Sequence, residues 1–172
     1  QMLVPIRLLA YLSRNDEASR YIVLNGLERV MLELNKHTSP GNANIQVSRA
    51  GCQLLYSLCE RSENHDALIA AKIIPYYQSL IAAYSTDRTI LMESLKVLVA
   101  FSRTPSDVSM LASQHVTESV LSVVKVSTEQ LDYEIVRMCT DVLLPFTSQK
   151  TVRAAILEAG VFTTILPLLP RF

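Results

Sequence analysis

A recurring pattern of apolar and polar positions runs along the chain. It is clearest in residues 19–34, SRYIVLNGLERVMLEL, where one amphipathic helix is expected to end at Gly26 and a second to follow at once. The apolar face of the second helix consists of Leu27, Val30, Met31 and Leu34. The pattern returns around Lys72, His115 and Gly160, with steps of 46, 43 and 45 residues between the four turns. This period predicts an all-α solenoid with two or three helices in each repeat.

Longer helices are expected between the short pairs. The ranges that the apolar spacing predicts as helical are 2–13, 17–25, 27–35, 45–61, 64–71, 74–84, 88–103, 106–114, 116–126, 129–147, 150–159 and 161–169. Asn15 and Asp16 can cap a helix start, HTSPGNAN at 37–44 is the longest expected loop, and Pro145 should end or kink its helix. The leucines expected in the core are Leu34, Leu55, Leu58, Leu98 and Leu143.

The periodic pattern covers the whole chain, 1–172, as a single repeat domain. Its expected divisions are a partial repeat at 1–15, repeats at 16–62, 63–104 and 105–148, and a partial repeat at 149–172. Both ends look cut within a repeat. We therefore expect neighbouring sequence, a partner or another copy of the chain to cover apolar surface at the ends.

The composition agrees with a repeat fold and argues against some classes of partner and location. Apolar residues make up 49% of the chain, which suits repeats that each bury surface against two neighbours. Sixteen basic and sixteen acidic residues cancel, which argues against nucleic acid as a partner. The apolar run at the start is interrupted by Pro5 and Arg7, so no membrane span is expected. An odd number of cysteines, three, indicates reduced thiols and a cytoplasmic location, with the nucleus and cytoskeleton left open.

A short helix, a turn often marked by glycine, a second helix patterned G-[AV]-[IL]-x-x-L-x-x-L and a longer third helix together resemble the armadillo repeat. The clearer copies are Gly26 with Leu27, Val30 and Leu34, and Gly160 with Val161, Ile165 and Leu168. The weaker copies are Lys72 with Ile73, Tyr77 and Leu80, and His115 with Val116, Val120 and Val123. The resemblance covers nearly the whole chain as about three full repeats and two partial ones, and the two-helix HEAT repeat is the nearest competitor.

The resemblance implies a right-handed superhelix whose third helices line a concave groove that binds extended segments of other proteins. Members that grip a peptide backbone carry an asparagine on the third helix. The equivalent positions here are Tyr11, Ser57, Ala100 and Pro145, and none is asparagine. An import-receptor or catenin type of peptide clamp is therefore not expected.

Residues one helical turn away from those positions should share the groove face. The candidate partner-binding residues on it are Arg7, Tyr11, Arg49, Gln53, Arg61, Lys96, Tyr133 and Arg137. The excess of basic side chains predicts a preference for an acidic or phosphorylated peptide, with the two tyrosines supplying flat contacts. The alternative is a solvated face whose charges pair with Glu60, Glu93 and Glu134 nearby.

Signals for chemistry are weak. His37, His65 and His115 are scattered along the chain and are interpreted as surface residues, so no metal site is expected. Cys59 lies in an apolar stripe, which predicts a buried core thiol rather than a nucleophile. The neighbouring tyrosines at 76 and 77 are interpreted as packing residues. No enzyme activity, cofactor or small-molecule substrate is predicted.

The function predicted from these observations is a non-catalytic protein interaction scaffold or adaptor. Two alternatives stay open. One is a structural or self-assembling component of the cytoskeleton or a cilium, joined through its apolar ends. The other is a regulatory domain of a larger enzyme.

Overall fold

The computed structural model describes residues 2–38, 44–130, 132–148, 150–158, 160 and 163. The chain divides into two compact units, Gln1–Tyr84 and Ser85–Phe172. Within the described residues all regular structure is helical, which confirms the all-α prediction. The expected helix at 161–169 lies outside the described residues, apart from position 163.

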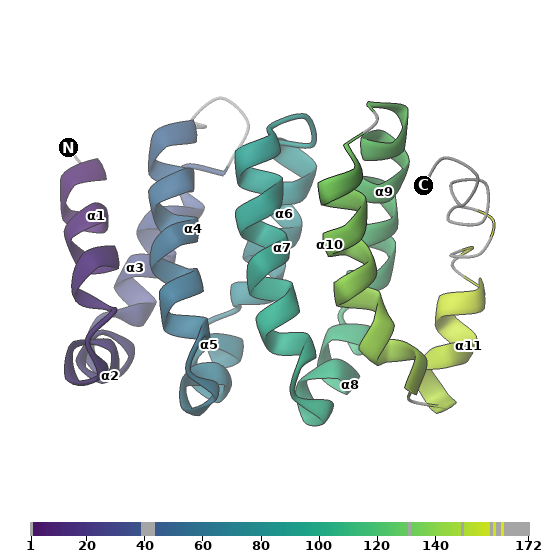
Figure 1. Ribbon diagram of the computed structural model, residues 1–172. Helices are drawn as coiled ribbons and strands as arrows, with labels where there is room; N and C mark the ends of the chain where they lie inside the picture. Colours follow the sequence, from purple (N-terminus) through teal and green to yellow (C-terminus); the bar gives the residue numbers. More distant parts are fainter. Residues whose placement is uncertain are drawn as a thin grey trace. The chain divides into compact units, whose positions relative to one another are not determined.

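The first unit pairs two helices side by side. Its elements are α1 (Leu3–Leu12), α2 (Asp16–Asn25), α3 (Leu27–Asn35), α4 (Ile45–Cys59), the 3-10 turn η1 (Ser62–Asn64), α5 (His65–Ala70) and α6 (Ile73–Ala83). Helix α1 packs against α4, and the two helices run in the same direction (Figure 1). Helices α2 and α5 follow at the end where α1 and α4 finish.

The second unit repeats this pairing. Its elements are α7 (Arg88–Ser102), α8 (Pro105–Ser113), α9 (Val116–Glu129), α10 (Tyr133–Leu143), the 3-10 turn η2 (Leu144–Ser148) and α11 (Lys150–Glu158). Helix α10 packs against both α7 and α9, and η2 packs against α8 and α11. As in the first unit, the paired helices α7 and α10 run in the same direction (Figure 1).

Side-chain caps set the start of four helices. Asn15, Asn44, Asp87 and Asp132 each accept hydrogen bonds from backbone N–H groups in the first turn of α2, α4, α7 and α10. These N–H groups have no partner within their own helix, so a short oxygen-bearing side chain just before the helix fixes where it begins. The expected cap at Asn15 is confirmed.

The expected helix at 129–147 is wrong at both ends. Helix α9 continues to Glu129, and α10 starts only at Tyr133 because Asp132 caps it. The α-helix then ends at Leu143 and tightens into η2, which contains Pro145. Proline has no N–H to donate to the preceding turn, so the prediction that it ends the α-helix is confirmed.

Two of the four turn positions adopt a left-handed backbone without glycine. Lys72 has φ 62° and His115 has φ 58°, while Gly160 has φ 78°. Gly26 is different, with φ −129°, so that turn does not require glycine on conformational grounds.

The cores of both units contain the residues that periodicity placed there. All five leucines expected in the core are buried. Tyr76 and Tyr77 are also buried, with ring centroids 5.4 Å apart and planes at 71°, which confirms a packing role. Gly51 lies in the middle of α4, where a Cβ atom would come 2.5 Å from Leu34 Cδ2 and 3.3 Å from the Tyr76 hydroxyl. Glycine at position 51 therefore permits close packing of α4 on its neighbours.

Several side-chain hydrogen bonds join residues that are 43 to 48 positions apart. In the first unit they include Arg20 Nε to Glu63 Oε1 at 3.0 Å, Asn64 Nδ2 to Ser19 Oγ at 3.2 Å and Tyr84 Oη to the His37 carbonyl at 3.3 Å. In the second unit Arg88 donates to Asp132 Oδ2 at 2.8 Å and also to Glu134. We call these bonds, together with those of Arg61 described below, the period-spaced ties.

Candidate protein-binding surface

The first unit presents four of the predicted binding residues on its paired helices. Arg7 and Tyr11 are exposed on α1, and Gln53 is exposed on α4. Arg49, also on α4, is half-buried. Because α1 and α4 pack together, these side chains come from adjacent helices rather than from distant parts of the unit.

Arg61 is half-buried, and its guanidinium is bound to other parts of the protein. Its Nε and Nη2 donate to Asp16 Oδ1 at 2.9 and 2.6 Å, and its Nη groups also donate to the carbonyls of Ser13, Arg14 and Ser57 at 3.1, 2.9 and 3.2 Å. A guanidinium has five N–H donors, and all five are used here. Arg61 therefore clamps the turn between α1 and α2 to the end of α4, and we leave it out of the proposed binding surface.

The second unit carries the other three predicted residues. Lys96 is half-buried on α7 and donates to Glu93 Oε1 at 2.8 Å. Tyr133 and Arg137 are exposed on α10. Glu134, considered as a partner for this face, binds Arg88 at the start of α7. The solvated-face alternative thus has one of its expected ion pairs, Lys96 with Glu93.

Sequence reasoning missed Arg88 as a structural residue. A signal was present, because its acidic partner Asp132 lies 44 positions away, close to the period of the apolar pattern. The same spacing links Arg61 with Asp16 and Arg20 with Glu63. Opposite charges one period apart would have pointed to these ties.

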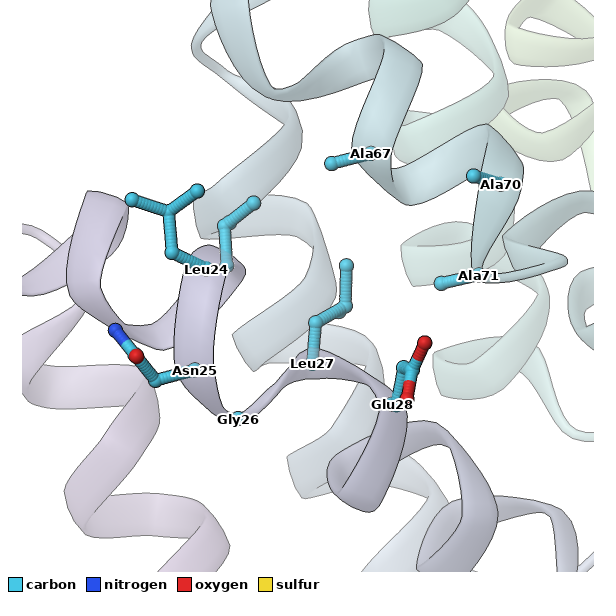
Figure 2. A pocket seen from close by; sticks show the side chains of 9 residues that line it. Leu24, Asn25, Gly26, Leu27, Glu28, Ala67, Ala70 and Ala71 are labelled. Carbon is cyan, nitrogen blue, oxygen red and sulfur yellow. The ribbon is translucent and has the colours of Figure 1, made fainter.

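A hollow of about 290 Å³ lies between the turn from α2 to α3 and helix α5. Most of its lining residues are apolar, but polar atoms contribute almost as much of the lining surface as apolar atoms do. Figure 2 shows Leu24 and Leu27 directed toward the side on which Ala67, Ala70 and Ala71 lie. Glu28 is the charged residue of the lining. Enzyme and cofactor pockets usually reach several hundred Å³ and combine apolar walls with several convergent polar groups. This hollow lies at the small end of that range, and Asn25 and Glu28 are its polar side chains.

The cysteine thiols are poorly suited to chemistry. Cys59 is buried in α4, as predicted, and burial raises its pKa well above the usual value. Burial likewise raises the pKa of Cys139 to about 12. A thiol reacts as the thiolate, which both environments disfavour.

The prediction of a surface location for His65 is wrong. The side chain is buried at the start of α5, and its Nε2 donates to the Cys59 carbonyl at 2.9 Å. This hydrogen bond offsets the cost of removing the imidazole from water and ties α5 to the end of α4. His115, in contrast, is exposed and pairs with Glu118 at 3.1 Å.

Within the described residues, no cluster of three histidine, cysteine, aspartate or glutamate side chains could hold a metal ion. Among the described helices, none has both the length and the apolar character needed to cross a membrane.

No protein-family model matches the chain, and no curated protein matches it. The armadillo resemblance therefore remains a prediction.

Proposed function

We propose that the chain is an armadillo-like α-solenoid that serves as a non-catalytic protein interaction scaffold. In this proposal the third helix of each repeat, represented by α1, α4, α7 and α10, offers a face to a segment of a partner protein. The preferred segment is acidic or phosphorylated.

The period-spaced ties carry the proposal of a solenoid. A repeat protein is held together by contacts between each repeat and the next one, so its long-range bonds should span about one period. The ties span 43 to 48 residues, and the apolar turns recur every 43 to 46. The packing of α1 on α4 and of α7 on α10 supports the same arrangement within each unit.

The positive charge of two exposed positions supports an acidic or phosphorylated partner segment. Arg7 in the first unit and Arg137 in the second are exposed, and each has an exposed tyrosine one helical turn away, Tyr11 and Tyr133. An arginine can form two parallel hydrogen bonds to a carboxylate or phosphate, and a tyrosine ring adds apolar contact. Each unit thus has the elements of a site for an acidic side chain.

Peptide arrays test the proposal. The arrays carry a set of extended peptides, each in a neutral version, a version with glutamates and a version with phosphoserines. They are probed with the 172-residue chain and its variants. We expect retention of the acidic and phosphorylated versions and about tenfold weaker binding after Arg7→Glu or Arg137→Glu, since a charge-assisted hydrogen bond is lost and a repulsion gained.

Lys125→Glu, an equal change of charge at an exposed position on α9, is the matched control and should bind like the wild type. Because Arg7 and Arg137 belong to different units, the two variants also report which unit holds the peptide. Equal retention of neutral and acidic versions, or an equal loss in the Lys125 variant, would refute the proposal.

A further inference from the structure

Helix α1 carries an apolar stripe that faces solvent. Val4, Leu8 and Leu12 are spaced four residues apart and so lie along one side of the helix, and they are 75%, 57% and 43% exposed. The opposite side of α1 is packed into the first unit through the buried Ile6. Helix α1 thus has apolar surface on two sides, and within the described part of the first unit it has a neighbour on one of them.

The corresponding stripes of α4 and α10 are buried. Advancing Val4, Leu8 and Leu12 by the 46-residue step of the first repeat gives Ala50, Leu54 and Leu58 of α4, which are 3%, 0% and 0% exposed. In the second unit the corresponding positions of α10 and η2 are Met138, Val142 and Phe146, which are buried as well.

In both units the helix with the buried stripe packs against a preceding parallel helix, α4 against α1 and α10 against α7 (Figure 1). The chain thus shows twice which kind of element accompanies burial of this stripe. It is an amphipathic α-helix that lies alongside and runs in the same direction.

The charges around the stripe describe the helix that would fit. Arg7 on α1 and Arg14 in the turn after it are both exposed, and α1 itself contains no acidic residue. The acidic residues that follow, Asp16 and Glu17, belong to the first turn of α2, where Asp16 binds Arg61. A two-fold pair of identical chains would bring the same surface of both copies together, arginines included. A second copy is therefore disfavoured, and a helix with acidic residues beside its apolar stripe is favoured.

We propose that Val4, Leu8 and Leu12 of α1 form a docking surface for an amphipathic α-helix that lies parallel to α1 and carries acidic residues facing Arg7 and Arg14. This surface shares Arg7 with the peptide-binding face proposed above, but it depends on the exposed apolar side chains of Val4, Leu8 and Leu12. It takes a folded helix through apolar burial, whereas the other face takes an extended acidic segment through charge.

Binding of a synthetic helix measures this directly. The probe is a fluorescein-labelled peptide of about 15 residues, stapled because short helices are marginal in water, with a leucine stripe flanked by glutamates. A second peptide has lysine in place of each glutamate. Fluorescence anisotropy with the 172-residue chain should show tighter binding of the glutamate peptide.

Leu8→Glu should weaken binding of the glutamate peptide by about tenfold or more, because it places a charge in a buried apolar contact. Leu32→Glu is the matched control, since Leu32 on α3 is 62% exposed against 57% for Leu8, and it should leave binding unchanged. Arg14→Glu should remove the preference for the glutamate peptide. Far-ultraviolet circular dichroism of each variant checks that the fold is retained.

Failure of both peptides to bind, or equal binding by the Leu8 variant and the wild type, would overturn the proposal. So would a wild-type dimer in sedimentation that Leu8→Glu dissociates, because a second copy would then occupy the surface. Failure of the peptide-array experiment would not affect this result, because the array tests recognition of charge by Arg7 and Arg137, whereas Leu8→Glu tests apolar burial on Val4, Leu8 and Leu12.

Discussion

The contact between Gly51 and Leu34 gives the sharpest prediction about stability. In an ordinary helix interior, Gly→Ala stabilises by about 1 kcal/mol because alanine loses less backbone entropy. Here the new methyl group would lie 2.5 Å from Leu34 Cδ2 and 3.1 Å from Leu34 Cδ1. Leu34 is fully buried, so its methyl groups have little room to move away.

The magnitude follows from two opposing terms. Inserting a methyl group into a packed core costs about 1–3 kcal/mol, and the gain in helix propensity returns about 1 kcal/mol. Gly51→Ala should therefore destabilise the protein by up to about 2 kcal/mol. Leu34→Ala alone should cost about 2–5 kcal/mol through the cavity it creates.

The double variant separates steric conflict from general damage. With Leu34 shortened, the two contacts with its methyl groups are gone and the Tyr76 hydroxyl at 3.3 Å is the nearest remaining neighbour. The methyl group at position 51 then partly fills the cavity and contributes its helix propensity. Gly51→Ala should then stabilise the Leu34→Ala background by about 1 kcal/mol, which is the reverse of its effect in the wild type. Urea unfolding followed by circular dichroism measures all four proteins. A stabilising effect of Gly51→Ala in the wild type, or additive effects in the double variant, would refute the steric explanation.

Three further predictions concern the buried thiol, the clamp and a turn. The Cys59 thiol should react with Ellman's reagent far more slowly in the native protein than in urea. Its pKa is higher in the folded protein than in the unfolded chain, so its contribution to stability is full below the unfolded pKa and is lost as the pH rises through the folded pKa. Alkaline unfolding that is insensitive to Cys59→Ala would contradict this. Arg61→Lys should cost about 1–3 kcal/mol in urea unfolding because it loses fixed hydrogen bonds to backbone carbonyls, whereas Arg20→Lys, at an exposed pair, should cost less than about 1 kcal/mol. Lys72→Gly relieves a left-handed backbone and should stabilise by up to about 1 kcal/mol, while Lys125→Gly in a helix interior should destabilise by about 1 kcal/mol; the same sign for both would rule out backbone strain at Lys72.

Periodicity predicted most helices because each one buries a single apolar stripe, and stripes are visible in sequence. Boundaries were less certain where two signals compete. The apolar pattern favoured a helix from Glu129 onward, but α9 ends at Glu129 and Asp132 caps the start of α10. The close approach at Gly51 was not predicted, because it depends on which side chains of other helices lie opposite.

The candidate surface was predicted less completely than the fold. Helical spacing placed Arg7, Tyr11 and Arg137 at exposed positions, and exposure is what a turn-by-turn argument can estimate. The same argument gave Arg61 the same role, although its guanidinium is fully engaged with Asp16 and three carbonyls. The burial of His65 was missed for a similar reason, since its hydrogen-bond partner is set by how α5 folds beneath α4.

The period-spaced ties restrict which insertions and deletions the chain can tolerate. Arg61 can bind Asp16, and Arg88 can bind Asp132, only when the intervening chain has the length that places the two side chains next to each other. Adding or deleting a few residues within that interval would leave a charge facing the wrong neighbour, whereas duplicating a whole interval would restore every match. Duplication of a complete interval should therefore be tolerated more easily than a change in the length of one interval.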